Sequence, residues 1–290
     1  MLSYLLAVLA ACANATSSVL QRKANREVPQ SENLSLRLIG RLLHQPVWFG
    51  GILAITFGFL LQATALGFGE LATVEPILVL ELPLTLILAS RVFGQQMRWQ
   101  EWSFSAAMTA GLGGLLFLLS PSAGRNGGVQ WWGWAVGVSL NVLLVLVLVM
   151  FGRREPVRGR GSAYRAGLLG IAAGSMFGLT AALMKGMTRT FSHGLVDLFT
   201  SWEIYGMVAA GLVGMFLVQS AMNAGGLIAA QPGLTLADPV ISVLWGVLAF
   251  HEQVRAGWFI LPELLSMAVL VAGVVALTRS PLLQDAADET

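Results

Sequence analysis

The chain has 290 residues, of which 56% are hydrophobic and only 11% are charged, and its mean hydropathy is +0.74. A soluble domain is about one-quarter charged, so this composition excludes an ordinary water-facing globular protein. The formal net charge of +2 is too small to indicate a partner such as nucleic acid. We therefore predict an all-α, polytopic helical membrane protein whose main partner is the lipid bilayer.

Nine apolar segments along the chain are predicted to be transmembrane helices. In chain order they are Ser3–Leu20, Val47–Leu66, Leu71–Ala89, Trp102–Leu119, Trp131–Phe151, Ala166–Met184, Trp202–Ala221, Leu227–Phe250 and Gly257–Thr278. Between the first two, residues 26–45 are too polar to span; they fit an amphipathic helix on the cytoplasmic surface or an ordinary loop. Residues 280–290 are predicted to be a disordered tail.

The loops indicate how the chain crosses the membrane. Most of the 17 basic residues fall in loops on one side, including the run from Arg153 to Arg165. The positive-inside rule places that side in the cytoplasm, with the N-terminus outside and the C-terminus inside. We expect a cell membrane, with a bacterial inner membrane favoured. Leu9-Ala10-Ala11-Cys12 is similar to a lipoprotein processing site, but residues 1–20 lack the basic stretch of a secretory signal.

The two halves of the chain repeat each other. Phe59-Leu60-Leu61-Gln62 returns as Phe216-Leu217-Val218-Gln219, Glu81 falls on Asp238 at the same offset of 157, and Leu5 and Arg22 fall on Leu168 and Lys185 at 163. Residues 1–120 and 164–279 are thus predicted to be two four-helix repeats, joined over residues 121–163 by a connector helix and a basic loop. Equivalent helices are five places apart in chain order, and this odd offset inverts the second repeat relative to the first.

Each half also carries a proline-rich apolar segment with acids at membrane depth. The first holds Glu75-Pro76 and Glu81-Leu82-Pro83, and the second holds Gln231-Pro232 and Asp238-Pro239. A charged group inside hydrocarbon is costly and persists mainly where it faces a partner or a polar cavity. Corresponding broken segments in two halves indicate a transporter's binding site. Pro76, Pro83, Pro232 and Pro239 are accordingly predicted to be helix breaks that shape this site.

Five polar residues are predicted to bind substrate or ion: Glu81, Asp238, Gln62, Gln219 and Glu75. Alternatives remain for several of them. Glu81 and Asp238 also fit a structural role, as protonated carboxyls that bond backbone groups freed by proline. The glutamines also fit interhelical hydrogen bonding, and Glu75 also fits a place in the outer vestibule or at the interface. The glycine-rich helices, including Gly170, Gly174 and Gly178, fit internal packing as well as a homodimer.

No catalytic or cofactor motif is found. The three histidines lie in predicted loops without metal-ligand spacing, and no nucleophile–base pair or nucleotide-binding motif is present. We therefore expect neither an enzyme nor a bound cofactor. Any active transport must be driven by an ion gradient.

The pattern resembles the drug/metabolite transporter superfamily, the EamA-like carriers, and within it the NIPA-like magnesium-transporter branch. The residues that carry the resemblance are Ser17 to Lys23, Ala72 to Ile77, Phe93 to Gln96, Gln219 to Asn223, Asp238-Pro239 and Phe250 to Glu252. The resemblance implies an inverted-repeat carrier over nearly the whole chain. Glu81 and Asp238 do not come from it and rest on the argument from the repeat alone.

Together these observations predict a secondary transporter that moves a small solute by alternating access, with Glu81 and Asp238 binding the coupling proton or cation. The alternative is a magnesium or other divalent-cation transporter, in which the same two carboxylates hold the metal together with water. A third possibility is a membrane scaffold or enzyme subunit that transports nothing.

Overall fold

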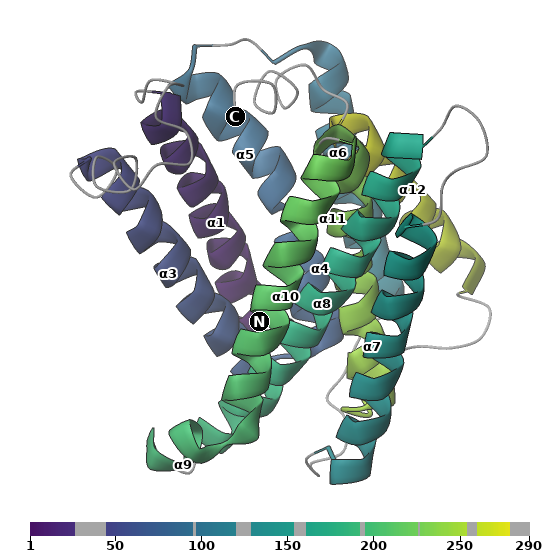
Figure 1. Cartoon of the computed structure of the whole chain (residues 1–290). Helices are drawn as coiled ribbons and strands as arrows, with labels where there is room; N and C mark the ends of the chain where they lie inside the picture. The colour runs from purple at the N-terminus through teal and green to yellow at the C-terminus, as the bar shows by residue number, and fades with distance from the viewer. Residues whose placement is uncertain are drawn as a thin grey trace.

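The computed structural model describes residues 1–26, 45–94, 97–119, 129–153, 161–191, 195–225, 227–253 and 260–278. Nearly all of these residues are helical (Figure 1). The helices are α1 (Leu2–Arg26), α3 (Pro46–Phe68), α4 (Leu71–Leu78), α5 (Glu81–Val92), α6 (Trp99–Leu119), α7 (Trp131–Arg153), α8 (Gly161–Phe191), α9 (Leu195–Thr200), α10 (Trp202–Gly225), α11 (Leu227–Leu248) and α12 (Ile260–Thr278). The predicted surface helix after α1 and the predicted tail lie outside the described residues, as does most of the basic loop.

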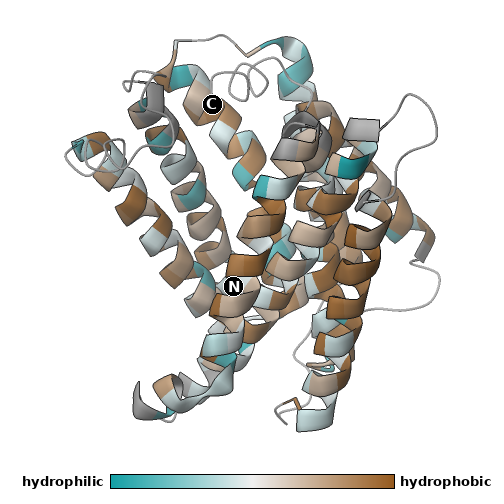
Figure 2. Cartoon of the chain, in the orientation of Figure 1, coloured by the Kyte–Doolittle hydropathy of each residue, from teal (hydrophilic) through white to brown (hydrophobic). Residues whose placement is uncertain are grey.

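The prediction of an all-α membrane protein is confirmed. Seven stretches are long and apolar enough to cross a membrane: Leu2–Gln21, Pro46–Phe68, Leu71–Val92, Trp99–Leu119, Trp131–Gly152, Ala163–Thr188 and Trp202–Met222. Figure 2 shows hydrophobic residues along most of the helical surface. A helix lies at each of the nine predicted places, but nine membrane crossings remain a prediction, because within the part of the chain that the structure describes seven stretches meet the length and composition of a span.

The prolines act differently in the two halves. Between α4 and α5 the chain breaks at Val79 and Leu80, where Val79 N–H bonds Pro76 O at 3.2 Å and Leu82 N–H bonds Val79 O at 3.2 Å. These bonds link residues three apart, as in a 3₁₀-helix. The α-helical bond to Val79 O would have to come from the N–H of Pro83, and proline has none. The break predicted in this segment is therefore present.

The predicted breaks at Pro232 and Pro239 are wrong, because α11 continues as one helix through both prolines. The packing of α11 gives the physical reason. It lies against α8 along one side and against α4 on another, and these neighbours hold its backbone in the helical path although two N–H donors are missing.

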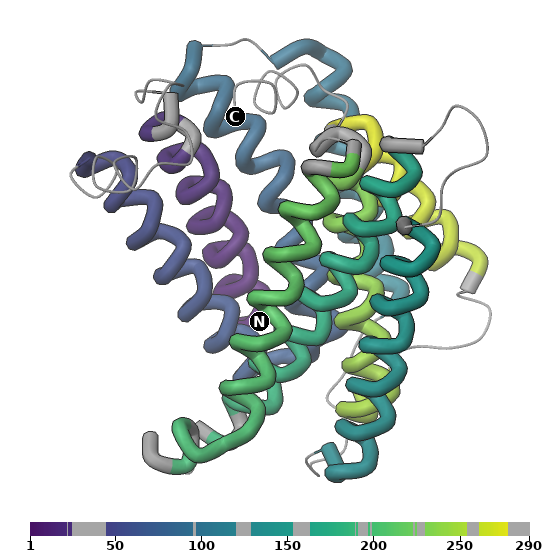
Figure 3. The backbone as a smooth tube through the Cα atoms, in the orientation of Figure 1, coloured from purple at the N-terminus to yellow at the C-terminus, as the bar shows by residue number. Residues whose placement is uncertain are grey.

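The helices form two packed groups. α1 packs against α3, α4 and α5, whereas α8 packs against α10, α11 and the connector α7. The groups meet where α4 contacts α11, where α3 contacts α8, and where α6 packs against α12. The backbone trace shows α1 and α3 approaching the α8–α10 group near the N-terminus and diverging from it toward the other end of α1 (Figure 3).

Glycines allow α8 and α11 to touch at the level of their backbones. A Cβ atom at Gly174 would lie 2.5 Å from Leu234 O and 2.8 Å from Ala237 Cβ, and one at Gly178 would lie 2.9 Å from Ile241 Cβ. A Cβ at Gly170 would overlap the Ala230 carbonyl. The small-residue spacing of α8 is thus used inside the protein, as helix packing in a membrane favours.

We predict that Gly174→Leu destabilises the protein by about 1–3 kcal/mol or more, since a larger side chain must push the α11 backbone away. Thermal unfolding in detergent will show this as a lowered Tm. The matched control is Gly113→Leu in α6, where an added Cβ meets nothing within 4 Å. Equal Tm values for the two variants would contradict the close α8–α11 contact.

Candidate functional site

A polar cavity of about 270 Å³ lies where the two helix groups meet. Side chains from α1, α3, α4, α5, α8 and α11 and from the α4–α5 break surround it. They are Asn14, Gln62, Glu75, Leu78, Val79, Glu81, Leu82, Phe177, Gln231, Leu234, Thr235, Asp238 and Pro239. Four of the five residues predicted to bind substrate or ion therefore share one cavity.

Glu75 is the most deeply buried of the cavity's acids. Its side chain is 2% exposed, and Gln62 Nε2 on α3 donates a hydrogen bond of 2.9 Å to its Oε1. Every residue from Leu71 to Ile77 of α4 is buried. Glu75 therefore lies inside the protein, in the wall of the cavity.

Glu81 occupies the first turn of α5, directly after the break, and accepts a hydrogen bond of 3.3 Å from Ser18 Oγ of α1. The free N–H groups at a helix N-terminus favour a negative charge, so this position suits a carboxylate at membrane depth. Asp238 on α11 accepts a bond of 3.4 Å from Ser242 Oγ, one turn further along its own helix.

The cavity has an acidic character. Asp238 interacts electrostatically with both Glu75 and Glu81, and no lysine or arginine is among the described residues that line the cavity. The remaining polar groups are neutral: two amides besides Gln62, and the hydroxyl of Thr235, which Gln231 Nε2 approaches at 3.4 Å. A site with this lining favours protons or positively charged solutes over anions.

Gln219 does not join the site. It is exposed on α10, on a helix that contributes no residue to the cavity lining. Of the four prolines, only Pro239 lines the cavity, while the buried Pro76 and Pro83 lie beside the α4–α5 break. Within the described residues, no group of three or more His, Cys, Asp and Glu side chains is arranged to hold a metal ion.

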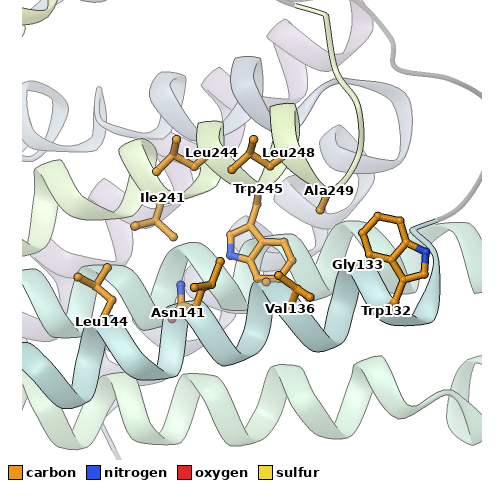
Figure 4. Close-up of a pocket in the computed structure, with 12 residues that line it drawn as sticks. Trp132, Gly133, Val136, Asn141, Leu144, Ile241, Leu244, Trp245, Leu248 and Ala249 are labelled. Carbon is orange, nitrogen blue, oxygen red and sulfur yellow. The ribbon is translucent and has the colours of Figure 1, made fainter.

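A second cavity, of about 310 Å³, lies between α7 and α11 (Figure 4). Its walls are mostly apolar and include Val136, Leu144, Ile241 and Leu244. The side chain of Asn141 donates to Ser175 O of α8 at 3.2 Å and so ties the connector helix to the second group. No described residue lines both cavities: α11 contributes residues between 231 and 239 to the first, and it contributes Ile241, Leu244, Trp245 and Leu248 to the second.

A buried ion pair was not predicted from the sequence. Lys185 of α8 and Glu252, in the turn after α11, are 6% and 4% exposed, and Lys185 Nζ contacts Glu252 Oε1. Both had been placed in loops, because each lies near the end of an apolar segment. The repeat offset of 163 relates Lys185 to Arg22, but no pattern in the sequence indicates that Lys185 contacts Glu252.

Comparison with known proteins gives one informative relative. The chain is 30% identical over 287 residues to an uncharacterized protein of Corynebacterium glutamicum, and the alignment covers 97% of each chain. No protein-family model matches the chain. No solved structure matches it either.

We predict that Gln62→Leu lowers the free energy of unfolding by about 1–3 kcal/mol, because the buried Glu75 carboxyl loses the hydrogen bond from Gln62. Thermal unfolding in detergent is the measurement. Gln219→Leu is the matched control, since this repeat-related glutamine is exposed, and a change of no more than about 0.5 kcal/mol is expected there. A larger loss in Gln219→Leu than in Gln62→Leu would contradict the assignment.

Proposed function

Because the chain belongs to the same family as the C. glutamicum protein, whose name states no activity, we propose a function from the cavity itself: the protein is a secondary transporter. It moves a small solute across the membrane by alternating access. Glu81 and Asp238 bind and release the coupling proton or cation. Glu75 and Gln62 complete the polar lining.

One observation carries this proposal: acids from both halves of the chain meet in a single cavity. Glu75 and Glu81 come from the first half and Asp238 from the second, although 157 residues separate Glu81 from Asp238. Carboxyls in apolar surroundings are costly. A membrane scaffold that transports nothing gives no reason for three carboxyls around one cavity in which no described lining residue is a lysine or arginine.

The arrangement of the helices supports two inverted repeats. α1 packs on α3 and on α4–α5, and in the second half α8 packs in the same way on α10 and α11. The equivalent helices α6 and α12 pack against each other, as do α4 and α11. Such mutual pairs are expected if a pseudo-twofold axis in the membrane plane relates the halves.

The cavity lining follows the same relation. Glu81 pairs with Asp238 at an offset of 157, Glu75 with Gln231 at 156, and Asn14 with Phe177 at 163. Substrate and ion sites of inverted-repeat carriers lie at the repeat interface near the midplane. The resemblance to the drug/metabolite transporters agrees with this placement.

The halves contribute different chemistry at equivalent positions. The first half supplies the amide of Asn14 and the carboxyl of Glu75, where the second supplies the ring of Phe177 and the amide of Gln231. The first half thus contributes two carboxyls to the cavity and the second half one. Such an acidic lining suits a cationic solute.

We predict that Glu81→Gln and Asp238→Asn each abolish coupled transport while leaving the fold intact, since each removes an ionisable group and keeps its shape. The measurement is charge movement by purified protein in liposomes after a pH jump and, separately, after addition of Mg²⁺. A pH-driven current in the wild type that is lost in both variants is the expected result.

Glu203→Gln is the matched control, because Glu203 lies in the first turn of α10 and does not line the cavity; its current should equal that of the wild type. A current that Mg²⁺ alone evokes would replace proton coupling by the divalent-cation alternative. A full pH-driven current in the double variant Glu81→Gln/Asp238→Asn would overturn the proposed role of the acids.

A further inference from the structure

We infer that the Lys185–Glu252 ion pair is a gate that closes one end of the cavity and must open during each transport cycle. The inference rests on the proposed transport function. It concerns a different part of the molecule from the acids, namely the end at which α3 leads into α4.

The contacts of the pair join the two halves of the chain. Glu252 Oε1 and Oε2 accept hydrogen bonds from the N–H groups of Leu71 and Ala72 at 2.7 and 2.9 Å. Lys185 Nζ donates to Glu252 Oε1 and also to Gly69 O, the latter at 2.9 Å. Two side chains from the second half thus hold the first turn of α4 from the first half.

These bonds complete the N-terminus of α4. Thr73 and Val74 N–H bond Glu70 O at 3.1 and 3.0 Å, so Glu252 supplies the acceptors for the two donors that precede them. The first N–H groups of a helix have no partner within the helix. A carboxylate at this position also gains from the helix dipole. At this end of α4 the polar groups are therefore paired with one another.

The pair lies directly beyond the cavity along three helices. On α4, Ala72 precedes the cavity residue Glu75 by three residues, which is about 4.5 Å along the axis. On α8, Lys185 follows the cavity residue Phe177 by eight residues, about 12 Å. On α11, Gly246 follows Asp238 by the same number, and its O accepts a 2.9 Å bond from Glu252 N–H. All three helices run from the cavity to the pair.

Aromatic rings pack around the same end. The Phe250 ring lies 5.3 Å from Lys185 Nζ and stacks edge-on against Trp134 at 5.9 Å. Trp134 in turn contacts Trp202 and Trp245. These rings reduce access of water to the ion pair, which strengthens its electrostatic attraction.

The opposite end of the molecule has a different arrangement. There α1 and α3 diverge from the α8–α10 group (Figure 3). The structure is thus joined across the halves at the Lys185–Glu252 end and splayed at the other. Rocking of one half against the other exposes such a site to the two sides in turn, and this requires the contacts of the pair to separate.

The test measures access to the cavity without any substrate. The only cysteine is removed by Cys12→Ser, and Thr235→Cys places a reporter thiol in the cavity lining. A membrane-impermeant maleimide is then applied to intact cells and to inverted membrane vesicles. In separate samples the exposed Asp197→Cys on α9 marks the side on which the pair lies, because α9 follows the α8 end that carries Lys185.

We expect slow labelling of Thr235→Cys from the side of the pair, and a rise on the order of tenfold in Lys185→Met, since truncating one partner of a buried pair is strongly destabilising to the closed state. Lys185→Met leaves the two bonds that the N–H groups of α4 donate to Glu252 in place. This variant is therefore expected to fold. Glu252→Gln should act in the same direction. An unchanged labelling rate in both variants would overturn the gate.

Glu101→Gln is the matched control. Glu101 is also a buried acid that caps a helix, accepting a 2.7 Å bond from Arg98 N–H at the start of α6, but it belongs to neither the cavity nor the pair. Faster labelling in this variant, equal to that of Lys185→Met, would also overturn the gate. The two experiments separate the two proposals. If Glu81→Gln and Asp238→Asn lose the current but Lys185→Met and Glu252→Gln leave the labelling rate unchanged, the proposed transport function stands and the gate is overturned.

Discussion

The close approach of α8 and α11 positions the functional groups that the second half of the chain contributes. Gly170, Gly174 and Gly178 let the two backbones meet, and this contact determines where the side chains of both helices point. α11 carries Asp238 and leads into the turn that holds Glu252, while α8 carries Lys185, the ion-pair partner of Glu252. In a bilayer, lipid is as apolar as the helix surface, so such steric fit takes the place of hydrophobic attraction between helices.

The second requirement is that polar groups inside this apolar chain be satisfied. The structure meets it in two ways. Around the cavity, carboxyls receive bonds from neutral side chains such as Gln62 and Ser18, which leaves room for protons or a cation. At the end of α4, Glu252 instead binds backbone N–H groups and a lysine. Under the two proposals, acids of one chemical type serve binding in one place and closure in another, according to their partners.

The helices and the pairing of two cavity acids could be predicted from the sequence. Membrane helices are recognised by their length and hydropathy, and the repeat offset of 157 predicted that Glu81 and Asp238 occupy equivalent positions. The exposed position of Gln219 could not be predicted, because equivalent residues of a repeat have the same surroundings only where the two halves pack alike, and α3 lines the cavity whereas the described lining includes no residue of α10. The unbroken course of α11 through Pro232 and Pro239 depends on neighbouring helices, which no local sequence pattern records. The Lys185–Glu252 pair lies next to a turn in which His251 adopts a φ of 54°, a conformation that is uncommon for any residue other than glycine.

The capping of α4 by Glu252 has a consequence for biogenesis. The two backbone donors at Leu71 and Ala72 find their acceptor 181 and 180 residues further along the chain. Until the ribosome has delivered that residue and α11 has docked, the helix bearing Glu75 starts with unpaired N–H groups, which are costly in hydrocarbon. The two halves are thus not independent folding modules, and the first attains its final form only after the second has been inserted.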